Sequence, residues 1–323
     1  MLVEGADKDN RTGDDARESD IPAAITDTGC ERQLNEDRYA VIESHSGLAW
    51  LVCDGMGGVT GGELAAQLAI DAIRRDLENL PPRSSDVALK GAILEANRII
   101  VLRRQNRAFA GMGTTIVSAI FNGPELVLAS VGDSRGYLIR DGAIQQLTTD
   151  HTFVQELVDK GQIRPEDALS HPQAHILTRC IGSEPGLDVE TRKYWIWQVP
   201  DTEPTDYLLL CTDGLYSLVS EGEMANIIAS NTPQRACVQL VETAKARGGY
   251  DNITCAIIPL GGQLKSEPPI GYKSPPVAAR NRAAPKKPKI QPASWGKLLV
   301  MVAVLSVLAM LVTIVATASY YLR

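Results

Sequence analysis

Two periodicities alternate along the middle of the chain. Apolar residues return every three or four positions in 63–77 and 86–102, which is the spacing of a helix with one buried face. Short aliphatic and β-branched runs are typical of strands, and they lie at 50–53, 113–121, 125–131, 137–140, 143–147, 207–211 and 253–258. Asn122-Gly123 and Asp141-Gly142 separate consecutive runs and favour hairpin turns. The pattern predicts an α+β fold of layered antiparallel sheets with helices outside, in preference to a doubly wound parallel sheet.

The two ends of the chain follow neither pattern. Residues 1–20 carry seven acidic and three basic side chains with few apolar ones, so we expect a disordered acidic arm. In 263–296, seven of the 34 residues are Pro and seven are Lys or Arg, a composition typical of an extended linker. The folded domain is therefore expected over 21–262.

A long apolar segment follows this linker. Residues 298–319 are 22 positions without a charge, Pro or Gly. At about 1.5 Å per residue, a helix of this length covers a hydrocarbon core of roughly 30 Å. A buried helix of a soluble domain is the alternative, but the Pro-rich linker leaves it no core to enter. We expect 297–323 to form a membrane anchor.

The charges beside this anchor predict its orientation. The basic residues on its N-terminal side outnumber Arg323 on the other, and they are Lys286, Lys287, Lys289 and Lys297. Under the positive-inside rule, the sequence predicts a single-pass cell-membrane protein with its large domain facing the cytoplasm.

Composition narrows the classes of function. Residues 263–323 carry nine Lys or Arg against the single Glu267, which leaves 23 basic and 38 acidic side chains in 1–262. This acidic domain excludes a nucleic-acid binder that relies on phosphate attraction, so no nucleic-acid partner is expected. The six cysteines show no C-x-x-C spacing and no N-terminal apolar segment precedes them, which favours reduced core thiols in the cytosol.

Three carboxylates stand at the ends of predicted strands. Asp54 begins D-G-M-G-G, Asp213 begins D-G-L and Asp251 begins D-N-I-T. A buried strand end tolerates a carboxylate only beside a positive partner, and no Lys or Arg adjoins these three. Their oxygens favour a shared Mg²⁺ or Mn²⁺. An Asp before Gly also makes simple turns, which is how we interpret Asp141. The glycines after Asp54 match neither G-x-G-x-x-G nor a P-loop, so the sequence gives little support for a nucleotide-binding site.

Four further motifs stand in a fixed order with these three. They are G-x-x-R-x-x-N-E-D at 29–37, G-M-G-T-T at 111–115, S-V-G-D-S-R at 130–135 and L-T-x-D-H at 147–151. Over about residues 24–260 the ordered set resembles the metal-dependent protein phosphatases of type 2C, in their compact bacterial form. The resemblance implies a four-layer α-β-β-α sandwich of mostly antiparallel sheets, with a metal cluster in a cleft at one edge.

The resemblance also implies a ligand set. Asp54 would bridge two Mn²⁺ or Mg²⁺ ions, and Asp213 and Asp251 would hold one of them. Glu36, mostly through water, and the carbonyl of Gly55 would serve the other ion. Asp133 matches a ligand of a third ion. Two cations that share a water supply hydroxide near neutral pH, so no covalent protein nucleophile is expected.

Other residues carry supporting roles. Arg32 matches the phosphate-binding arginine of the family, whose planar fork orients the ester for attack. Asp37 either supports the ligands by accepting hydrogen bonds or is purely structural. Animal members have a His where this chain has Met56, which leaves the general acid open. For His151 we favour hydrogen bonding within a loop over proton donation.

Residues 152–185 occupy the place of the mobile flap in the family. Each of five residues there either touches substrate or belongs to ordinary surface structure. They are His171, Pro172, His175, Thr178 and Arg179.

The predicted function is hydrolysis of phosphoserine and phosphothreonine in proteins through a metal-bridged hydroxide. The expected partners are an autophosphorylated Ser/Thr kinase and its targets, and the catalytic domain is expected to be monomeric. One alternative is a phosphatase for regulators of the anti-sigma-antagonist type, against which Arg32 and the long 152–185 segment argue. The other is a catalytically silent, membrane-bound module that binds phosphoproteins, against which the complete carboxylate set argues.

Overall fold

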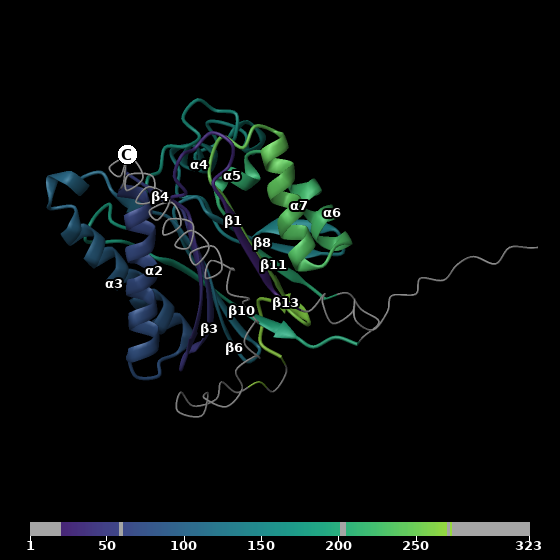
Figure 1. Ribbon diagram of the computed structural model, residues 1–323. Coiled ribbons are helices and arrows are strands. Elements are labelled where there is room, and N and C mark those ends of the chain that lie inside the picture. Colours follow the sequence, from purple (N-terminus) through teal and green to yellow (C-terminus); the bar gives the residue numbers. More distant parts are fainter. Residues whose placement is uncertain (1–20, 58–60, 201–204, 270–271, 273–323) are drawn as a thin grey trace, which may run out of the picture. The chain divides into compact units, whose positions relative to one another are not determined.

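Two antiparallel sheets lie face to face, with helices over both outer faces (Figure 1). The computed structural model describes residues 21–57, 61–200, 205–269 and 272. The chain divides into two compact units, Met1–Pro285 and Lys286–Arg323, and every described residue belongs to the first.

The strands form a five-stranded sheet, a six-stranded sheet and a short two-stranded ladder, and their pairings are antiparallel. The first sheet has the order β1 (Ala23–Asp27), β12 (Ile253–Pro259), β11 (Tyr207–Cys211), β8 (Arg135–Arg140), β9 (Ala143–Gln146). The second has the order β13 (Gln263–Lys265), β10 (Glu190–Trp197), β7 (Glu125–Val131), β6 (Ile116–Asn122), β3 (Gly47–Cys53), β2 (Arg38–Ser44). The ladder pairs β4 (Gly55–Met56) with β5 (Gly113–Thr114). These pairings confirm the predicted antiparallel layers.

The helices complete two further layers. Helices α2 (Gly61–Asn79) and α3 (Ser85–Arg103) lie on the second sheet, and α5 (Asp213–Tyr216), α6 (Glu221–Ser230) and α7 (Pro233–Ala246) lie on the first. Short helices in connecting segments are η1 (Arg107–Phe109), α4 (Phe153–Asp159) and η2 (Pro165–Asp167). The sequence predicted α2 and α3 closely, whereas α6 and α7 were not predicted.

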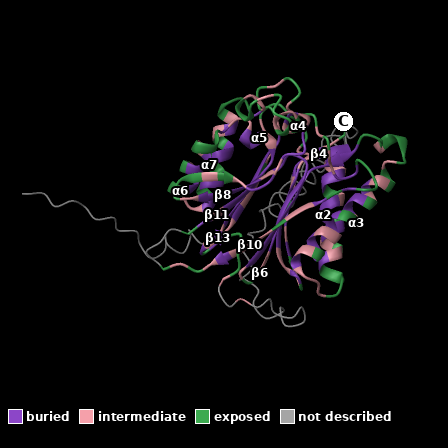
Figure 2. Cartoon of the chain, turned by 180° about the vertical axis from the view of Figure 1, so that it is seen from behind, coloured by how far each residue is buried: buried purple, intermediate pink, exposed green. Residues whose placement is uncertain are grey.

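Three buried clusters hold these layers together. Ile73 of α2 and Ile93 of α3 pack on one face of the second sheet, and Leu240 of α7 packs on one face of the first. Trp50 of β3 and Leu208 of β11 belong to the third cluster, between the two sheets. Figure 2 shows the strands largely buried, with exposed residues on the outer sides of the helices and in the connecting loops. Each sheet therefore buries both of its faces, one against helices and one against the other sheet, which gives four layers with a buried cluster between each neighbouring pair.

One of the two predicted hairpin turns is displaced. Asp141 and Gly142 have φ values of 50° and 72°, the left-handed backbone of a two-residue hairpin loop. In the other hairpin Asn122 pairs with Glu125, so the loop residues are Gly123 and Pro124. The turn that we expected at Asn122-Gly123 therefore lies one residue later, because Pro cannot donate to the ladder and is excluded from the paired positions.

The domain also extends beyond its predicted end. Residues 263–265, expected to begin the linker, form β13 and pair with β10 at the sheet edge. The indole nitrogen of Trp197 then donates a hydrogen bond to the carbonyl of Glu267 (2.8 Å). A short strand of polar composition gives little periodic signal, which is why the boundary was placed too early.

Three of the predicted segments lie wholly or largely outside the residues that the structure describes. The arm at 1–20, most of the linker and the span at 298–319 lie outside the described residues. Among the described residues, no helix is long and apolar enough to cross a membrane. All six cysteines are free thiols, as expected, but Cys30 is exposed and Cys180 half-buried rather than part of the core.

Candidate metal centre

The predicted site residues converge at one end of the sandwich. Asp54 follows β3, Asp133 follows β7, Asp213 comes soon after β11 and Asp251 precedes β12. Because neighbouring antiparallel strands run in opposite directions, these starts and ends meet at the same edge. A cavity of about 700 Å³ lies there, and the residues that line it include Arg32, Glu36, Asp54, Gly55, Asp133, Asp213 and Asp251. The structure thus brings together every predicted metal ligand and the predicted phosphate-binding arginine.

Glycines allow the backbone to close around this cavity. A Cβ on Gly55 would stand 2.1 Å from the carbonyl oxygen of Gly62, and one on Gly62 would stand 2.5 Å from Oε1 of Glu36. A Cβ on Gly214 would stand 2.0 Å from the carbonyl oxygen of Asn252. Only glycine permits these approaches, which place Glu36 beside Gly55 and the Asp213 loop beside the Asp251 loop.

The carboxylates repel one another in this setting. Burial raises the pKa of Asp54 well above its ordinary value, and the charges of Asp37, Asp213 and Asp133 raise it further. Burial and the charge of Asp213 raise the pKa of Asp133 to about 8, and they also raise the pKa of Asp251. Oδ1 of Asp213 is buried and has no hydrogen-bond partner among the described residues. A site with this much unbalanced negative charge is suited to a cation.

The carboxylates are not arranged around one common position for an ion. Within the described ranges, no three Asp, Glu, His or Cys side chains are grouped tightly enough to hold an ion as they stand. Instead Arg32 donates to Oδ2 of Asp251 (2.8 Å), and Nδ1 of His175 lies 3.7 Å from Oδ2 of Asp213.

The donor chemistry nevertheless fits Mg²⁺ or Mn²⁺. Both ions prefer carboxylate and carbonyl oxygens, which this cavity offers together with the unpartnered oxygen of Asp213. The residues that would hold the ions are Glu36, Asp54, the carbonyl of Gly55, Asp133, Asp213 and Asp251.

Asp37 lies behind the cavity rather than on its wall. Only 1% of the residue is exposed, and its Oδ2 accepts a hydrogen bond from the hydroxyl of Thr212 (2.9 Å). Burial raises the pKa of Asp37 to about 7. Asp37 therefore accepts a hydrogen bond from the residue that immediately precedes Asp213 and not from a ligand itself.

His151 is buried outside the cavity lining. Its Nδ1 accepts a hydrogen bond from the backbone N–H of Gly132 (3.0 Å), and burial, with the charge of Arg179, lowers its pKa. This geometry supports the loop interpretation over proton donation.

The five flap residues separate in the same way. His175 lines the cavity, whereas Thr178 and Arg179 contact His151 instead. Nδ1 of His171 accepts a hydrogen bond from the backbone N–H of Gln173 on the surface, and Pro172 is exposed and does not line the cavity.

Hydroxyl groups near Asp54 were missed by the sequence reasoning. The Thr115 hydroxyl accepts a hydrogen bond from the N–H of Asp54 (3.0 Å), and that of Thr114 donates to the Asp54 carbonyl (2.8 Å). Thr115 also shares a 2.6 Å hydrogen bond with the hydroxyl of Ser134. The paired threonines of G-M-G-T-T were the available signal, since they lie where β5 ends and β6 is about to begin.

The cavity is equipped to bind and hydrolyse a phosphate ester. The guanidinium of Arg32 can donate two hydrogen bonds to phosphoryl oxygens. Burial raises the pKa of the Cys180 thiol, so it stays protonated, and the Thr115 hydroxyl is occupied by Asp54 and Ser134. Neither of these two side chains is activated for nucleophilic attack, which favours water as the nucleophile. Fold and site together define a metal-dependent phosphoester hydrolase.

Comparison with known proteins names the family. Residues 30–242 match the family model described as Protein phosphatase 2C. Serine/threonine phosphatase stp of Listeria welshimeri is 39% identical over 241 residues, which cover 72% of this chain and 93% of that protein. Serine/threonine protein phosphatase PstP of Mycobacterium tuberculosis is 36% identical over 237 residues, which cover 73% of this chain and 44% of that protein. The chain belongs to the protein phosphatase 2C family.

Solved structures agree with this assignment. The serine/threonine phosphatase of S. agalactiae superimposes with a TM-score of 0.67 at 32% identity, covering 73% of this chain and 97% of that one. The catalytic domain of PstP in complex with two manganese ions gives a TM-score of 0.61 at 34% identity, covering 73% and 96%.

Proposed function

We propose that this protein phosphatase hydrolyses phosphoserine and phosphothreonine in proteins, with Mn²⁺ or Mg²⁺ as its cofactor. The observation that carries the proposal is the cavity that joins Arg32 to Asp54, Asp213 and Asp251. The similarity to phosphatases named for serine and threonine supports the choice of ester, and the manganese complex of PstP supports the choice of metal.

Each group of residues has a distinct part in this reaction. When bound, the cations lower the pKa of water and offset the negative charge of the phosphoryl group. Asp54, Asp213 and Asp251 would hold the cations, and the backbone of Asp54 is itself fixed through Thr114 and Thr115. Arg32 leaves Asp251 and binds the phosphoryl oxygens, which orients the ester for in-line attack.

A set of matched phosphopeptides tests this function. Three peptides of one sequence would carry phosphoserine, phosphothreonine or phosphotyrosine, and phosphate release would be measured with Mn²⁺, with Mg²⁺ and with chelator. We expect release from the first two peptides only, and only with metal. Equal release from all three, or release in chelator, contradicts the proposal.

The physiological substrates in this proposal are an autophosphorylated Ser/Thr kinase and the proteins it modifies. Phosphoserine and phosphothreonine in proteins are the products of such a kinase, so this phosphatase must act after one. One chain supplies all the predicted site residues, so the site needs no residue from a second copy. Loss of the phosphatase should raise phosphorylation of the kinase itself, which phosphopeptide mass spectrometry of the kinase measures.

The proposal places this domain on the cytoplasmic face of the cell membrane, anchored by residues 298–319. The support is the 22-residue uncharged stretch and the lysines before it. We expect the full chain to remain with membranes after alkaline extraction and to resist protease added outside sealed cells. Recovery in the soluble fraction contradicts the anchor, and digestion of the domain from outside contradicts the orientation.

A further inference from the structure

His151 is a buried titratable side chain that the reaction described above does not use. It lies between two parts of the molecule that carry site residues. One is the Asp133 loop, residues 132–134, and the other is the segment 176–179, which returns from the flap. About 8% of His151 is exposed, so it acts through its neighbours and not on substrate.

On one side His151 closes a two-bond ring with Gly132. Its Nδ1 accepts from the backbone N–H of Gly132 (3.0 Å), and its own backbone N–H donates to the Gly132 carbonyl (2.9 Å). Gly132 has φ of 101°, and a Cβ there would stand 2.6 Å from Cγ2 of Thr115. The backbone immediately before Asp133 is therefore held in a conformation that only glycine adopts without strain, and the His151 ring is what caps its N–H.

On the other side, residues of the segment 176–179 contact His151. The His151 carbonyl accepts from the N–H of Thr178 (2.9 Å). Nε2 lies 3.3 Å from Nη1 of Arg179 and 3.7 Å from Oε2 of Glu190. Because a backbone N–H can only donate, Nδ1 is the unprotonated acceptor for Gly132, and Nε2 lies beside the guanidinium of Arg179, which also only donates.

Two further side chains, from α5 and from the segment before β6, also hold the Asp133 loop in place. The hydroxyl of Tyr216, at the end of α5, donates to the carbonyl of Asp133 (3.1 Å), and the hydroxyl of Ser134 bonds that of Thr115 (2.6 Å). The three residues of the Asp133 loop are thus each held by a different side chain. Such supports normally orient a ligand, and their loss weakens metal binding.

We propose that His151 is a positioning residue whose bare Nδ1 fixes the N–H of Gly132 and thereby aims the Asp133 carboxylate at a third divalent cation. The proposal rests on the proposed function, because it assigns Asp133 a cation beside the pair held by Asp54, Asp213 and Asp251. It distinguishes His151 from a catalytic residue, since His151 is not among the residues that line the cavity.

Three substitutions of one side chain test which nitrogen matters. Asn places its amide oxygen near the position of Nδ1, so His151→Asn keeps an acceptor for Gly132. His151→Gln carries its amide one bond further out, near the position of Nε2. His151→Leu keeps neither. Tyr216→Phe removes the hydrogen bond to the Asp133 carbonyl, and Asp133→Asn identifies the third binding step by abolishing it.

The readout is Mn²⁺ binding by calorimetry and by paramagnetic resonance, with thermal unfolding as the folding control. We expect three Mn²⁺ in the wild type. In His151→Leu and His151→Gln the third should bind about 10- to 100-fold more weakly, as for other lost supports of a ligand. His151→Asn should recover most of that affinity, and Tyr216→Phe should weaken the same step.

Several outcomes overturn the inference without touching the proposed function. They are a wild type that binds only two Mn²⁺, a third step unchanged in His151→Leu, and equal losses in His151→Asn and His151→Gln. If His151→Leu does not fold, the comparison of the Asn and Gln variants still decides. A wild type that releases no phosphate from phosphoserine or phosphothreonine peptides overturns the proposed function instead.

Discussion

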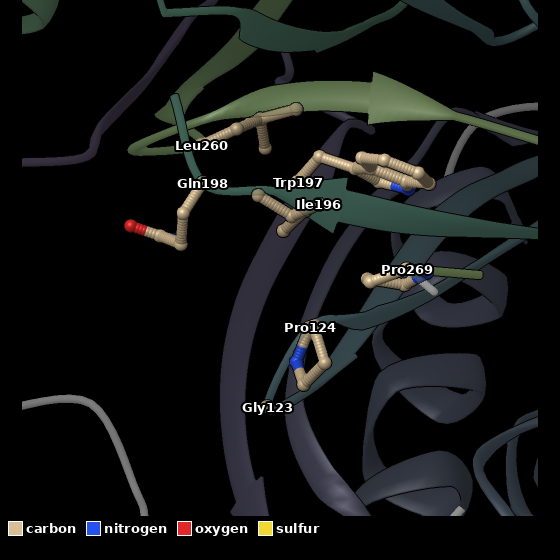
Figure 3. A pocket seen from close by; sticks show the side chains of 7 residues that line it. All are labelled: Gly123, Pro124, Ile196, Trp197, Gln198, Leu260 and Pro269. Carbon is tan, nitrogen blue, oxygen red and sulfur yellow. The ribbon is translucent and has the colours of Figure 1, made fainter. Parts of the chain in front are cut away.

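The two ends of the sandwich are both hollowed, but with opposite chemistry. At one end a cavity of about 700 Å³ is lined by carboxylates and Arg32. At the other end lies a cavity of about 520 Å³ (Figure 3), whose lining contains neither an acid nor a base. That lining is Gly123, Pro124, Ile196, Trp197, Gln198, Leu260 and Pro269.

The same strands supply both ends. β7 is preceded by Pro124 and followed by Asp133, and β12 is preceded by Asp251 and followed by Leu260. The backbone architecture is therefore shared, and the side chains at the strand ends decide which cavity can bind a cation and a phosphate. At the acidic end, burial and the mutual repulsion of the carboxylates raise the pKa of Asp54 and Asp133. The lining of the apolar cavity contains no charged side chain, so no such repulsion arises there.

The largest effect in this comparison should come from neutralising the acidic end. Asp54→Asn removes the central ligand while keeping its volume, so we expect no detectable turnover of a phosphate ester at any Mn²⁺ concentration. The metal-free variant should unfold at a temperature no lower than the wild type, because one repelling charge is gone. Phosphate release and thermal unfolding measure the two effects. Substantial activity in this variant would remove Asp54 from the mechanism.

Arg32 distinguishes substrate binding from metal binding at the same end. A charge-assisted hydrogen bond contributes about 1.5–3 kcal/mol, so Arg32→Ala should raise KM for a phosphate ester about 10- to 100-fold. Arg32→Lys keeps the charge but loses the planar fork of donors, so its KM should lie between those of the wild type and Arg32→Ala. Steady-state kinetics at saturating Mn²⁺ provide the test. An unchanged KM with weaker Mn²⁺ binding would show that Arg32 serves the metal site alone.

The repulsion at the acidic end should also make metal-free stability depend on pH. Burial raises the pKa of Asp133 to about 8 and that of Asp37 to about 7, so the folded domain binds these protons more tightly than the unfolded chain does. The free energy of unfolding should therefore fall as pH rises from about 6.5 to 8.5. Thermal unfolding in chelator should show a drop of a few degrees, at about 2–4 °C for each kcal/mol.

Two comparisons serve as controls for this pH effect. Asp133→Asn should flatten the slope, since one of the titrating carboxyls is gone. Saturating Mn²⁺ should flatten it in the wild type, because the cations offset the same charges. A metal-free domain whose stability rises over this pH range contradicts the account of the acidic end.

The smallest effect should come from the apolar end. Ile196→Val removes one buried methylene beside the cavity of Figure 3, which costs about 0.5–1.5 kcal/mol of folding stability. Because no atom of this cavity takes part in the reaction, kcat/KM for a phosphate ester should not change. Denaturant unfolding and kinetics on the same preparation check both statements. A loss of activity that exceeds the loss of folded protein would show that the two ends are coupled.

Local patterns predicted the acidic end better than the fold around it. Helices α2 and α3 were predicted because large aliphatic residues recur along them, whereas the large aliphatic residues that α7 buries are only Leu240 and Val241, which are adjacent. Strand β10 reads E-T-R-K-Y-W-I-W and lies at mostly intermediate exposure, so its alternation is weak. Strand-end aspartates stood out because each is followed by a short, fixed motif.

The supports of the site could not be predicted in the same way. Thr115 bonds Ser134, and Tyr216 bonds the Asp133 carbonyl, across segments that only the folded sheets bring together. Such contacts depend on strand register and loop approach, which a periodic pattern does not specify. The sequence therefore identifies the charged ligands, while the groups that orient them emerge only from tertiary structure.

The central claim is that the acidic cavity, and no other part of the domain, holds the cations of the reaction. Crystals grown with Mn²⁺ and measured at the manganese absorption edge test it most directly. We predict strong anomalous peaks in contact with Asp54, Asp213 and Asp251, and their loss in Asp54→Asn. A cavity without peaks in crystals of an enzyme that Mn²⁺ activates, or peaks confined to other surfaces, would contradict the account.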